Sequence, residues 1–200
     1  MTNHYLNFYG KEIVLASQSP RRKEILEMIG LDFTITPSDY QEENDEIQDP
    51  EELAIFHSLE KARNVAEKYK NAWIIGADTI VLREDRVMEK PANKEAAIKM
   101  LNTLSGNVHI VYTGYTILNS SNGKYLSDSE STIVTFKELN DEIIKYYINN
   151  YQYRDKAGSY AIQDFSALFV KDIVGSFYNV VGFPVAKFSE LVRNKLSTCL

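Results

Sequence analysis

The feature that most constrains the fold is a run of ten residues, 73–82, in which most side chains are apolar. A strand made from this run carries apolar side chains on both faces, so it fits the middle of a sheet that is covered on both sides. Segments with helical spacing precede and follow it in the sequence. We therefore expect an α/β fold with a mixed central β-sheet flanked by helices.

Five segments combine a start signal with apolar residues at helical spacing, and each is expected to form a helix. Their expected first or capping residues are Ser19, Asp49, Asn93, Asn140 and Pro184. In the first, Pro20 stands at the favoured first helical position and Gly30 supplies the end. The second is expected to bury a stripe formed by Leu53, Phe56, Leu59, Ala62 and Ala66.

Runs rich in β-branched and apolar residues between these helices are expected to be strands. They span residues 13–16, 33–36, 73–82, 109–118, 132–136, 167–170 and 179–181. The polar segment 119–124 is expected to turn the chain back toward Tyr125. Because no repeat, low-complexity tract or Pro/Gly-rich linker interrupts the sequence, we expect residues 1–200 to form a single domain.

Charge and cysteine content exclude several classes of protein. The formal net charge is −6, whereas a non-specific nucleic-acid binder relies on a surplus of Lys and Arg. The single cysteine, Cys199, excludes an intramolecular disulfide framework and a cysteine-based zinc cluster. The N-terminus has no basic stretch followed by a long apolar one, and the longest apolar run is about half a membrane span. We expect a cytoplasmic protein with neither nucleic acid nor membrane as a partner.

The first candidate site is the segment Ser17–Arg22, where a strand runs into a helix. A helix N-terminus carries partial positive charge, and its first turn usually contains carboxylates. Here the first turn carries Arg21 and Arg22 instead, an awkward arrangement unless an anion binds there. Free backbone N–H groups and two guanidinium groups together favour a phosphate-binding site. The alternative is that both arginines are solvated or pair with the acidic loop 42–49.

The second candidate is Asp78, which interrupts the apolar run 73–82. A buried carboxylate needs a cation or hydrogen-bond donors. It could cap a turn at the strand end, or serve as a metal ligand or general base where α/β folds place their sites. Four further polar residues are weaker signals on their own: Glu42, Lys61, Lys90 and Gln163.

Together these motifs resemble the Maf family of nucleoside triphosphate pyrophosphatases, once named for inhibition of septum formation. The resemblance covers nearly the whole chain. It rests on Leu15-Ala-Ser-Gln-Ser-Pro-Arg-Arg-Lys-Glu-Ile-Leu, Ile75-Gly-Ala-Asp-Thr-Ile-Val, Glu89-Lys-Pro-Ala, Met100-Leu-Asn-Thr-Leu-Ser-Gly-Asn-Val-His with Thr113-Gly, Asp155-Lys-Ala-Gly-Ser-Tyr-Ala-Ile-Gln and Asn179-Val-Val-Gly-Phe-Pro.

The resemblance implies an elongated Maf/ITPase-like domain with a substrate cleft. It implies cleavage of the α–β phosphoanhydride of a nucleoside triphosphate, to the monophosphate and pyrophosphate, with Mg²⁺ or Mn²⁺. Family members are often dimeric, which leaves a homodimer open. Matched by position, the substrate-contacting residues are Ser17, Arg21, Arg22, Lys61, Lys90 and Gln163. Glu42 and Asp78 match the catalytic carboxylates, which would also hold the metal, and Asp78 matches the proton acceptor.

Three positions separate two branches of the family. The branch acting on dTTP and UTP looks like this chain, with Arg21, Thr79 and Gln163, whereas the branch acting on 7-methyl-GTP tends to carry Trp, Gln and Glu there. The resemblance therefore implies a dTTP/UTP pyrophosphatase, although Asp164 replaces a common glycine beside Gln163. The alternatives are a cell-division regulator that acts through protein contacts and a house-cleaning hydrolase of modified or purine nucleotides.

Overall fold

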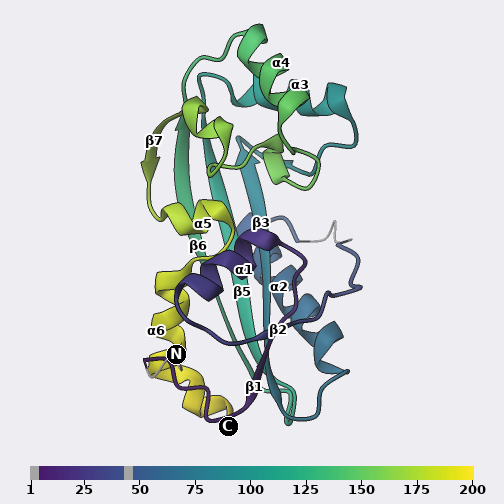
Figure 1. The fold of residues 1–200 in the computed structure, drawn as a ribbon, viewed down its shortest axis with the longest axis vertical. Helices are drawn as coiled ribbons and strands as arrows, with labels where there is room; N and C mark the ends of the chain where they lie inside the picture. The colour runs from purple at the N-terminus through teal and green to yellow at the C-terminus, as the bar shows by residue number, and fades with distance from the viewer. Residues whose placement is uncertain (1–4, 43–46) are drawn as a thin grey trace. The chain divides into compact units, whose positions relative to one another are not determined.

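The computed structural model describes residues 5–42 and 47–200 (Figure 1). The chain forms two compact units. Unit 1 comprises residues 1–78, 113–130 and 182–200, and unit 2 comprises residues 79–112 and 131–181. The acidic residues Glu43, Asp45 and Glu46 lie outside the described part of the chain.

The strands belong to one mixed sheet with the order β2-β1-β3-β5-β6-β7, and β4 pairs with β3. Three long strands contribute residues to both units: β3 (Ala72–Arg83), β5 (Val108–Asn119) and β6 (Tyr125–Phe136). The expected α/β fold with a mixed sheet is confirmed. The expected single domain stays a prediction.

Unit 1 contains the parallel part of the sheet. Here β1 (Glu12–Leu15) pairs with β2 (Thr34–Ile35) on one side and with β3 on the other, both in parallel, and Val14 lies opposite Ile74. Its helices are α1 (Pro20–Met28), α2 (Pro50–Ala66), α6 (Val185–Lys195) and the 3₁₀ helix η3 (Leu196–Cys199). Every residue of β3 from Ala72 to Asp78 is buried, as expected of a central strand.

Two glycines let α2 lie directly against the sheet. A Cβ atom on Gly76 of β3 would stand 2.1 Å from the carbonyl oxygen of Ser58, and one on Gly114 of β5 would stand 2.3 Å from the carbonyl carbon of Ala54. Real Cβ atoms do not approach backbone so closely, so any side chain at either position would push α2 away. These glycines fix where α2 crosses β3.

The face of α2 on the sheet is therefore not the stripe of large side chains expected from the sequence. The fully buried residues are Ala54, His57, Ser58, Leu59, Ala62 and Val65, while Leu53, Phe56 and Ala66 are only half-buried. Small side chains are needed opposite the two glycines because the backbones come so close. On the opposite side of β5, Tyr115 packs against Phe183 and Phe188 of the α6 segment.

Unit 2 contains the antiparallel part of the sheet and its own core. The strand β4 (Arg86–Met88) pairs with β3, and β7 (Val170–Val174) pairs with β6, both antiparallel. Its helices are α3 (Lys94–Leu104), α4 (Asp141–Asn150), α5 (Phe177–Val181) and the 3₁₀ helices η1 (Ala157–Ser159) and η2 (Phe165–Phe169). Phe136 packs edge-on against His109, Tyr160 and Phe169 at its centre.

Two of the expected strands are wrong. Residues 167–170 are mostly the 3₁₀ helix η2, with β7 beginning at Val170, and residues 179–181 belong to the helix α5. The contacts of Asn179 explain why residues 179–181 are helical. Its buried amide nitrogen donates to the carbonyl of Val111 and to the hydroxyl of Thr132, and these bonds tie the short helix to the sheet.

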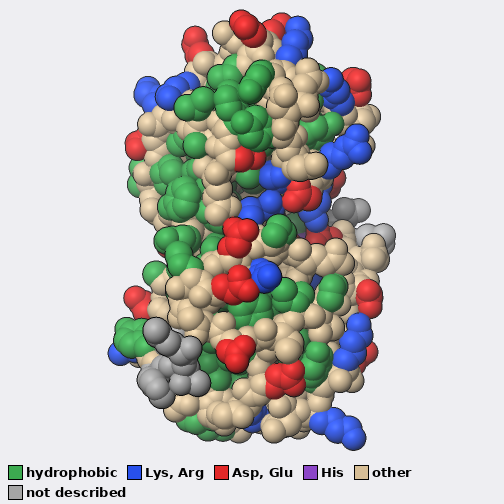
Figure 2. All heavy atoms as spheres, viewed as in Figure 1, with side chains coloured by type: hydrophobic (Ala, Val, Ile, Leu, Met, Phe, Trp, Pro, Cys, Tyr) green, Lys and Arg blue, Asp and Glu red, His purple; other side chains and the backbone are tan. Residues whose placement is uncertain are grey.

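The surface carries charges of both signs. On the face drawn in Figure 2, acidic and basic side chains are interspersed, and neither sign covers that face alone. Within residues 5–42 and 47–200, no helix has the length and apolar character that crossing a membrane requires.

Candidate active site

Asp78 points toward α2 because of strand geometry. Successive side chains of a strand face opposite sides, so Gly76 and Asp78 share one face of β3. The contact of Gly76 with α2 includes Ala62, and Lys61 precedes Ala62 on that helix. The close crossing of α2 over β3 therefore brings Lys61 beside Asp78.

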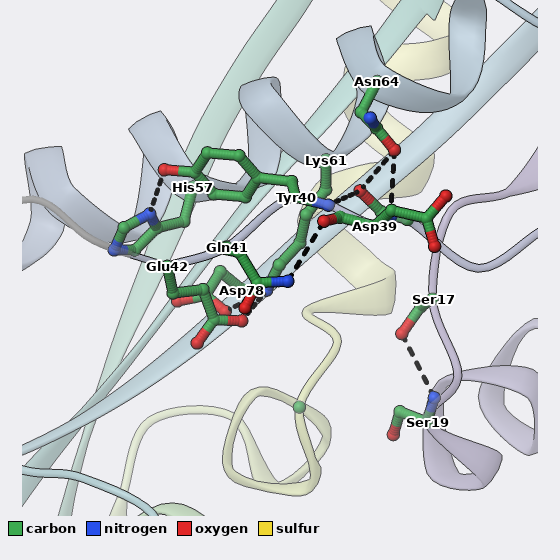
Figure 3. Close-up of polar contacts among 12 residues, drawn as sticks. Ser17, Ser19, Asp39, Tyr40, Gln41, Glu42, His57, Lys61, Asn64 and Asp78 are labelled. Atoms are coloured by element: carbon green, nitrogen blue, oxygen red, sulfur yellow. Dashed lines mark hydrogen bonds and ion pairs between the residues drawn. The ribbon is translucent and has the colours of Figure 1, made fainter.

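Lys61 bridges two carboxylates (Figure 3). Its Nζ lies 2.5 Å from Asp78 Oδ1 and 2.5 Å from Glu42 Oε1. The Lys61 and Asp78 side chains are 12% and 10% exposed, whereas that of Glu42 is 36% exposed. Three residues that are far apart in the sequence thus form one charged group, with one end buried and the other reaching solvent.

Asp78 is held in its ionised form. Burial raises the pKa of its carboxyl, but the charges of Lys61 and Arg22 and the hydrogen bond from Lys61 outweigh burial. The pKa of Asp78 therefore lies below its ordinary value. A buried carboxylate that stays ionised at neutral pH can accept a proton or hold a cation.

Arg22 is fixed at the start of α1. Its Nε donates to the carbonyl of Gly182 at 2.9 Å, and its Nη1 donates to Ser17 Oγ at 3.1 Å. Burial lowers the pKa of Arg22, the charge of Asp78 raises it, and neighbouring Arg21 lowers it again. A guanidinium stays charged in proteins, so Arg22 places a buried positive charge at the start of α1.

The start of α1 differs in one detail from the expectation. Ser19 occupies the N-cap position with Pro20 after it, but its side chain makes no capping hydrogen bond. Instead, the backbone N–H of Ser19 donates to Ser17 Oγ at 3.2 Å. The first turn contains no acidic residue. Ser17 therefore organises both the turn and Arg22, and the helix start keeps its positive character.

Sequence reasoning missed the role of Gly182. Its φ of 118° lies in the region that favours glycine, and its carbonyl is the acceptor that orients Arg22. A signal was present, because Gly182 lies in the motif Asn179-Val-Val-Gly-Phe-Pro. The segment 38–42 and its contacts with α2, through Tyr40, His57 and Asn64, were also missed.

Three further predicted site residues, Thr79, Lys90 and Gln163, belong to unit 2, whereas Arg21 lies in unit 1. Thr79 is half-buried and, as the residue after Asp78, points to the other face of β3. Lys90 is exposed beside buried Pro91. Gln163 is also exposed in the segment before η2.

The residue after Gln163 stabilises that segment. The carboxylate of Asp164 accepts hydrogen bonds from the backbone N–H of Ser166 and from the hydroxyl of Tyr147. Unit 1 thus brings together Ser17 with Arg22, and Glu42 with Lys61 and Asp78. The participation of Arg21, Thr79, Lys90 and Gln163 in the same site stays a prediction.

Comparison with known proteins gives the family. The sequence model described as "Maf-like protein" matches residues 12–195. The chain belongs to this family. Among curated proteins, a dTTP/UTP pyrophosphatase of Thermoanaerobacter sp. (strain X514) is 45% identical over 190 residues, which cover 94% of this chain and 99% of the relative. A protein of the same name from Pyrococcus furiosus is 44% identical and covers 92% and 95% of the two chains.

A solved structure supports the fold of this Maf-like protein. The structure of a HAM1 protein from Coxiella burnetii matches with a TM-score of 0.50 at 15% sequence identity. The match covers 92% of this chain and 98% of that one. At this identity the similarity concerns the fold alone.

The donor chemistry of the Maf-like site fits a hard divalent cation in part. Within residues 5–42 and 47–200, no group of three or more His, Cys, Asp or Glu side chains is arranged to hold a metal ion. Glu42 and Asp78 nevertheless both face one cationic centre, the Lys61 ammonium group. Carboxylate oxygens are the ligands of Mg²⁺ and Mn²⁺, and Mg²⁺ sites commonly combine one or two carboxylates with water and substrate phosphates.

Proposed function

We propose that this protein is a nucleoside triphosphate pyrophosphatase that hydrolyses dTTP and UTP to the monophosphate and pyrophosphate. The observation that carries the proposal is the ionised, buried Asp78, bridged by Lys61 to Glu42. The names of the curated relatives support the substrates, because proteins 44–45% identical over almost the whole chain are called dTTP/UTP pyrophosphatases.

In this proposal, the start of α1 binds the polyphosphate. Arg22 is oriented by Gly182 and Ser17 before substrate arrives, so little side-chain entropy is lost on binding. Arg21 adds a second positive charge, and the backbone N–H groups of the helix start add donors. The bound anion would offset the repulsion between the two arginines at the helix start.

The reaction is a displacement at the α-phosphorus. The oxygen of a water molecule forms a bond to the α-phosphorus, the bond from that phosphorus to the α–β bridging oxygen breaks, and pyrophosphate leaves with the electron pair. Asp78 accepts the proton of the water, because its carboxylate is ionised and buried. Lys61 and Lys90 neutralise negative charge as it develops on the phosphates.

We further propose that Glu42 and Asp78 hold Mg²⁺ or Mn²⁺. When bound, such an ion neutralises phosphate charge and makes a nearby water more acidic. Lys61 holds the two carboxylates close together.

The proposed base preference rests on Gln163. A side-chain amide has both a donor and an acceptor, so it can pair with the O4 acceptor and the N3–H donor of uracil or thymine. Thr79 is small and leaves room for the ring, and Arg21 braces the ring or the phosphates.

The decisive experiment measures pyrophosphate release from a panel of nucleotides, with and without Mg²⁺ or Mn²⁺. We expect rapid metal-dependent release from dTTP and UTP and slow release from ATP, ITP and 7-methyl-GTP. Preference for a purine nucleotide would favour the house-cleaning alternative, and no release from any nucleotide would favour a non-enzymatic role. A homodimer and a cytoplasmic location stay predictions, which sedimentation and cell fractionation test.

A further inference from the structure

The segment that carries Glu42 is held along one side of α2 (Figure 3). Asn64 Oδ1 accepts two hydrogen bonds from this segment, from the backbone N–H of Asp39 at 2.9 Å and from Ser38 Oγ at 3.1 Å. The Tyr40 hydroxyl lies 3.0 Å from His57 Nδ1, and Lys68 pairs with the Asp39 carboxylate at 3.1 Å. Each of these contacts precedes Glu42 by only a few residues.

The helical residues in these contacts follow the helical repeat. His57, Lys61, Asn64 and Lys68 are separated by four, three and four residues. Such spacing places side chains on one side of a helix, and Lys68 continues it in the turn after α2. We call these four residues the α2 polar stripe. For Lys68, Asn64 and Lys61 the partners run in the opposite direction along the segment, from Asp39 to Glu42, whereas His57 contacts Tyr40.

The ion pair of Glu42 with Lys61 is a weak anchor by itself. Glu42 is 36% exposed, and ion pairs that reach solvent contribute little because water screens them and two long side chains must be ordered. The contact of Asn64 differs in kind. It fixes the main chain of Asp39, which is three residues before Glu42, so it restricts where the Glu42 backbone can lie.

We propose that Asn64 is a positioning residue that sets the register of the segment 38–42 on α2 and so places the Glu42 carboxylate at Lys61 and Asp78. Its carbonyl oxygen acts through the main chain of Asp39 and does not touch substrate. The proposal rests on the proposed function for its kinetic consequence, but the placement of Glu42 can be measured without turnover.

The test compares Asn64→Ala and Asn64→Leu, which lack the acceptor, with Asn64→Asp, which keeps an oxygen in the same place. Arg63→Ala is the matched control, because Arg63 is an exposed neighbour on α2 that pairs with Glu60. Circular dichroism and thermal unfolding show which variants fold. Leucine nearly preserves the side-chain volume in case the alanine variant does not fold.

Two measurements are independent of activity. Hydrogen exchange, read on peptides that cover residues 36–42, reports whether the Asp39 amide stays protected. Competitive acetylation, read by mass spectrometry, reports whether the Lys61 amine stays shielded by two carboxylates. We expect Asn64→Ala and Asn64→Leu to exchange roughly fivefold to tenfold faster at this segment, the factor expected for a lost hydrogen bond, and to label Lys61 more than twofold faster. Asn64→Asp and Arg63→Ala should match the wild type in both.

The kinetic measurement uses dTTP with saturating Mg²⁺. We expect Asn64→Ala and Asn64→Leu to lower kcat roughly fivefold to tenfold with KM within twofold of wild type, and Asn64→Asp to restore kcat. Unchanged Lys61 labelling in both variants that lack the acceptor would overturn the proposal, even if the segment exchanges faster. Unchanged kcat with faster labelling would overturn it as well. If the wild type hydrolyses no nucleotide, the proposed function fails, while labelling and exchange still decide the placement of Glu42.

Discussion

At the scale of single residues, Asp78 shows how a charge can lie in a strand that is covered on both faces. Ala77 and Ile80 on the same strand are buried and apolar. Compensation comes from Lys61 of α2 and Arg22 of α1, which lower the pKa of the carboxyl despite burial. Two helices that pack for other reasons thus deliver the cations that a buried carboxylate needs.

The first prediction concerns Asp78→Asn, which keeps the volume of the side chain but removes its charge. We expect kcat for dTTP to fall by about 10²-fold to 10⁴-fold, which is the range that a general base contributes, while the protein still folds. Pyrophosphate release and circular dichroism measure the two effects. Turnover like that of the wild type in a folded Asp78→Asn protein would contradict the assignment of the site.

The second prediction concerns the choice of base. Gln163→Glu replaces a donor by an acceptor, so kcat/KM for dTTP and UTP should fall by roughly 10²-fold or more, because a mismatched hydrogen-bonding edge is strongly rejected. The charge that Gln163→Glu adds would lie beside Asp164, so the uncharged variant Gln163→Leu is the control for charge repulsion. Both variants should lose dTTP hydrolysis with melting temperatures close to that of the wild type. Higher activity of the native protein on 7-methyl-GTP than on dTTP would refute this role of Gln163.

At the scale of elements, the position of α2 decides the geometry of the site. The helix meets the sheet through Ala54, Ser58 and Ala62, which are one turn apart, and two of its contacts fall on Gly76 and Gly114. A prediction that looks for large apolar side chains places Leu53 and Phe56 on the buried face of α2. The predicted buried face is therefore turned about the helix axis relative to the observed one. The correct face is small because the two backbones approach closely.

The third prediction tests this crossing. Gly76→Ala would place a Cβ atom 2.1 Å from the Ser58 carbonyl, so α2 must move and Lys61 with it. We expect both a loss of stability of roughly 1–3 kcal/mol, as for overpacked cores, and a fall in kcat. Gly30→Ala is the control, since Gly30 has a φ of 72° but open space around it. It should lose about 1 kcal/mol from backbone strain and keep kcat.

The expected and observed helices and strands together show which elements a sequence can predict. Helices with clear caps formed where expected, and Asp49, Asn93 and Asn140 accept capping hydrogen bonds from the first turns of α2, α3 and α4. The short apolar runs 167–170 and 179–181 were wrongly expected to be strands, because periodicity does not separate a buried strand from a short helix. In the second run, the hydrogen bonds of Asn179 to Val111 and Thr132 decide the conformation, and they join segments distant in sequence.

At the scale of the whole molecule, the candidate site is assembled by the fold rather than by local sequence. Residue types alone indicated Asp78 and the arginine pair, because a charge in an apolar strand and cations at a helix start each need a partner. They did not indicate that Lys61 joins Asp78 to Glu42, which depends on where α2 crosses β3. Nor did they indicate Gly182 or Asn64, which act by fixing the main chain or a neighbouring side chain.

The last prediction concerns the acid stability of the whole protein and rests on His109. This side chain is 1% exposed, and its Nε2 lies 2.7 Å from the Tyr160 hydroxyl. Burial, aided by the charge of Arg83, lowers the pKa of His109 from 6.5 to about 4. The unfolded chain therefore binds a proton near pH 6.5 that the folded protein takes up only near pH 4. Stability is unaffected above pH 6.5 and is lost as the pH falls toward 4.

The size of the effect follows from the two pKa values. Each unit of pKa difference corresponds to about 1.4 kcal/mol, so His109 should lower the free energy of unfolding by up to about 3 kcal/mol between pH 7 and pH 4. Urea unfolding is measured at several pH values for the wild type and for His109→Gln. The difference between the two proteins isolates the contribution of His109 to the free energy of unfolding, because all other titrating groups are common to both. Glutamine lowers stability at pH 7 through poorer packing, but the difference between the two proteins should shrink steadily below pH 6.5. A difference that stays constant from pH 7 to pH 4 would mean that folding does not lower the pKa of His109.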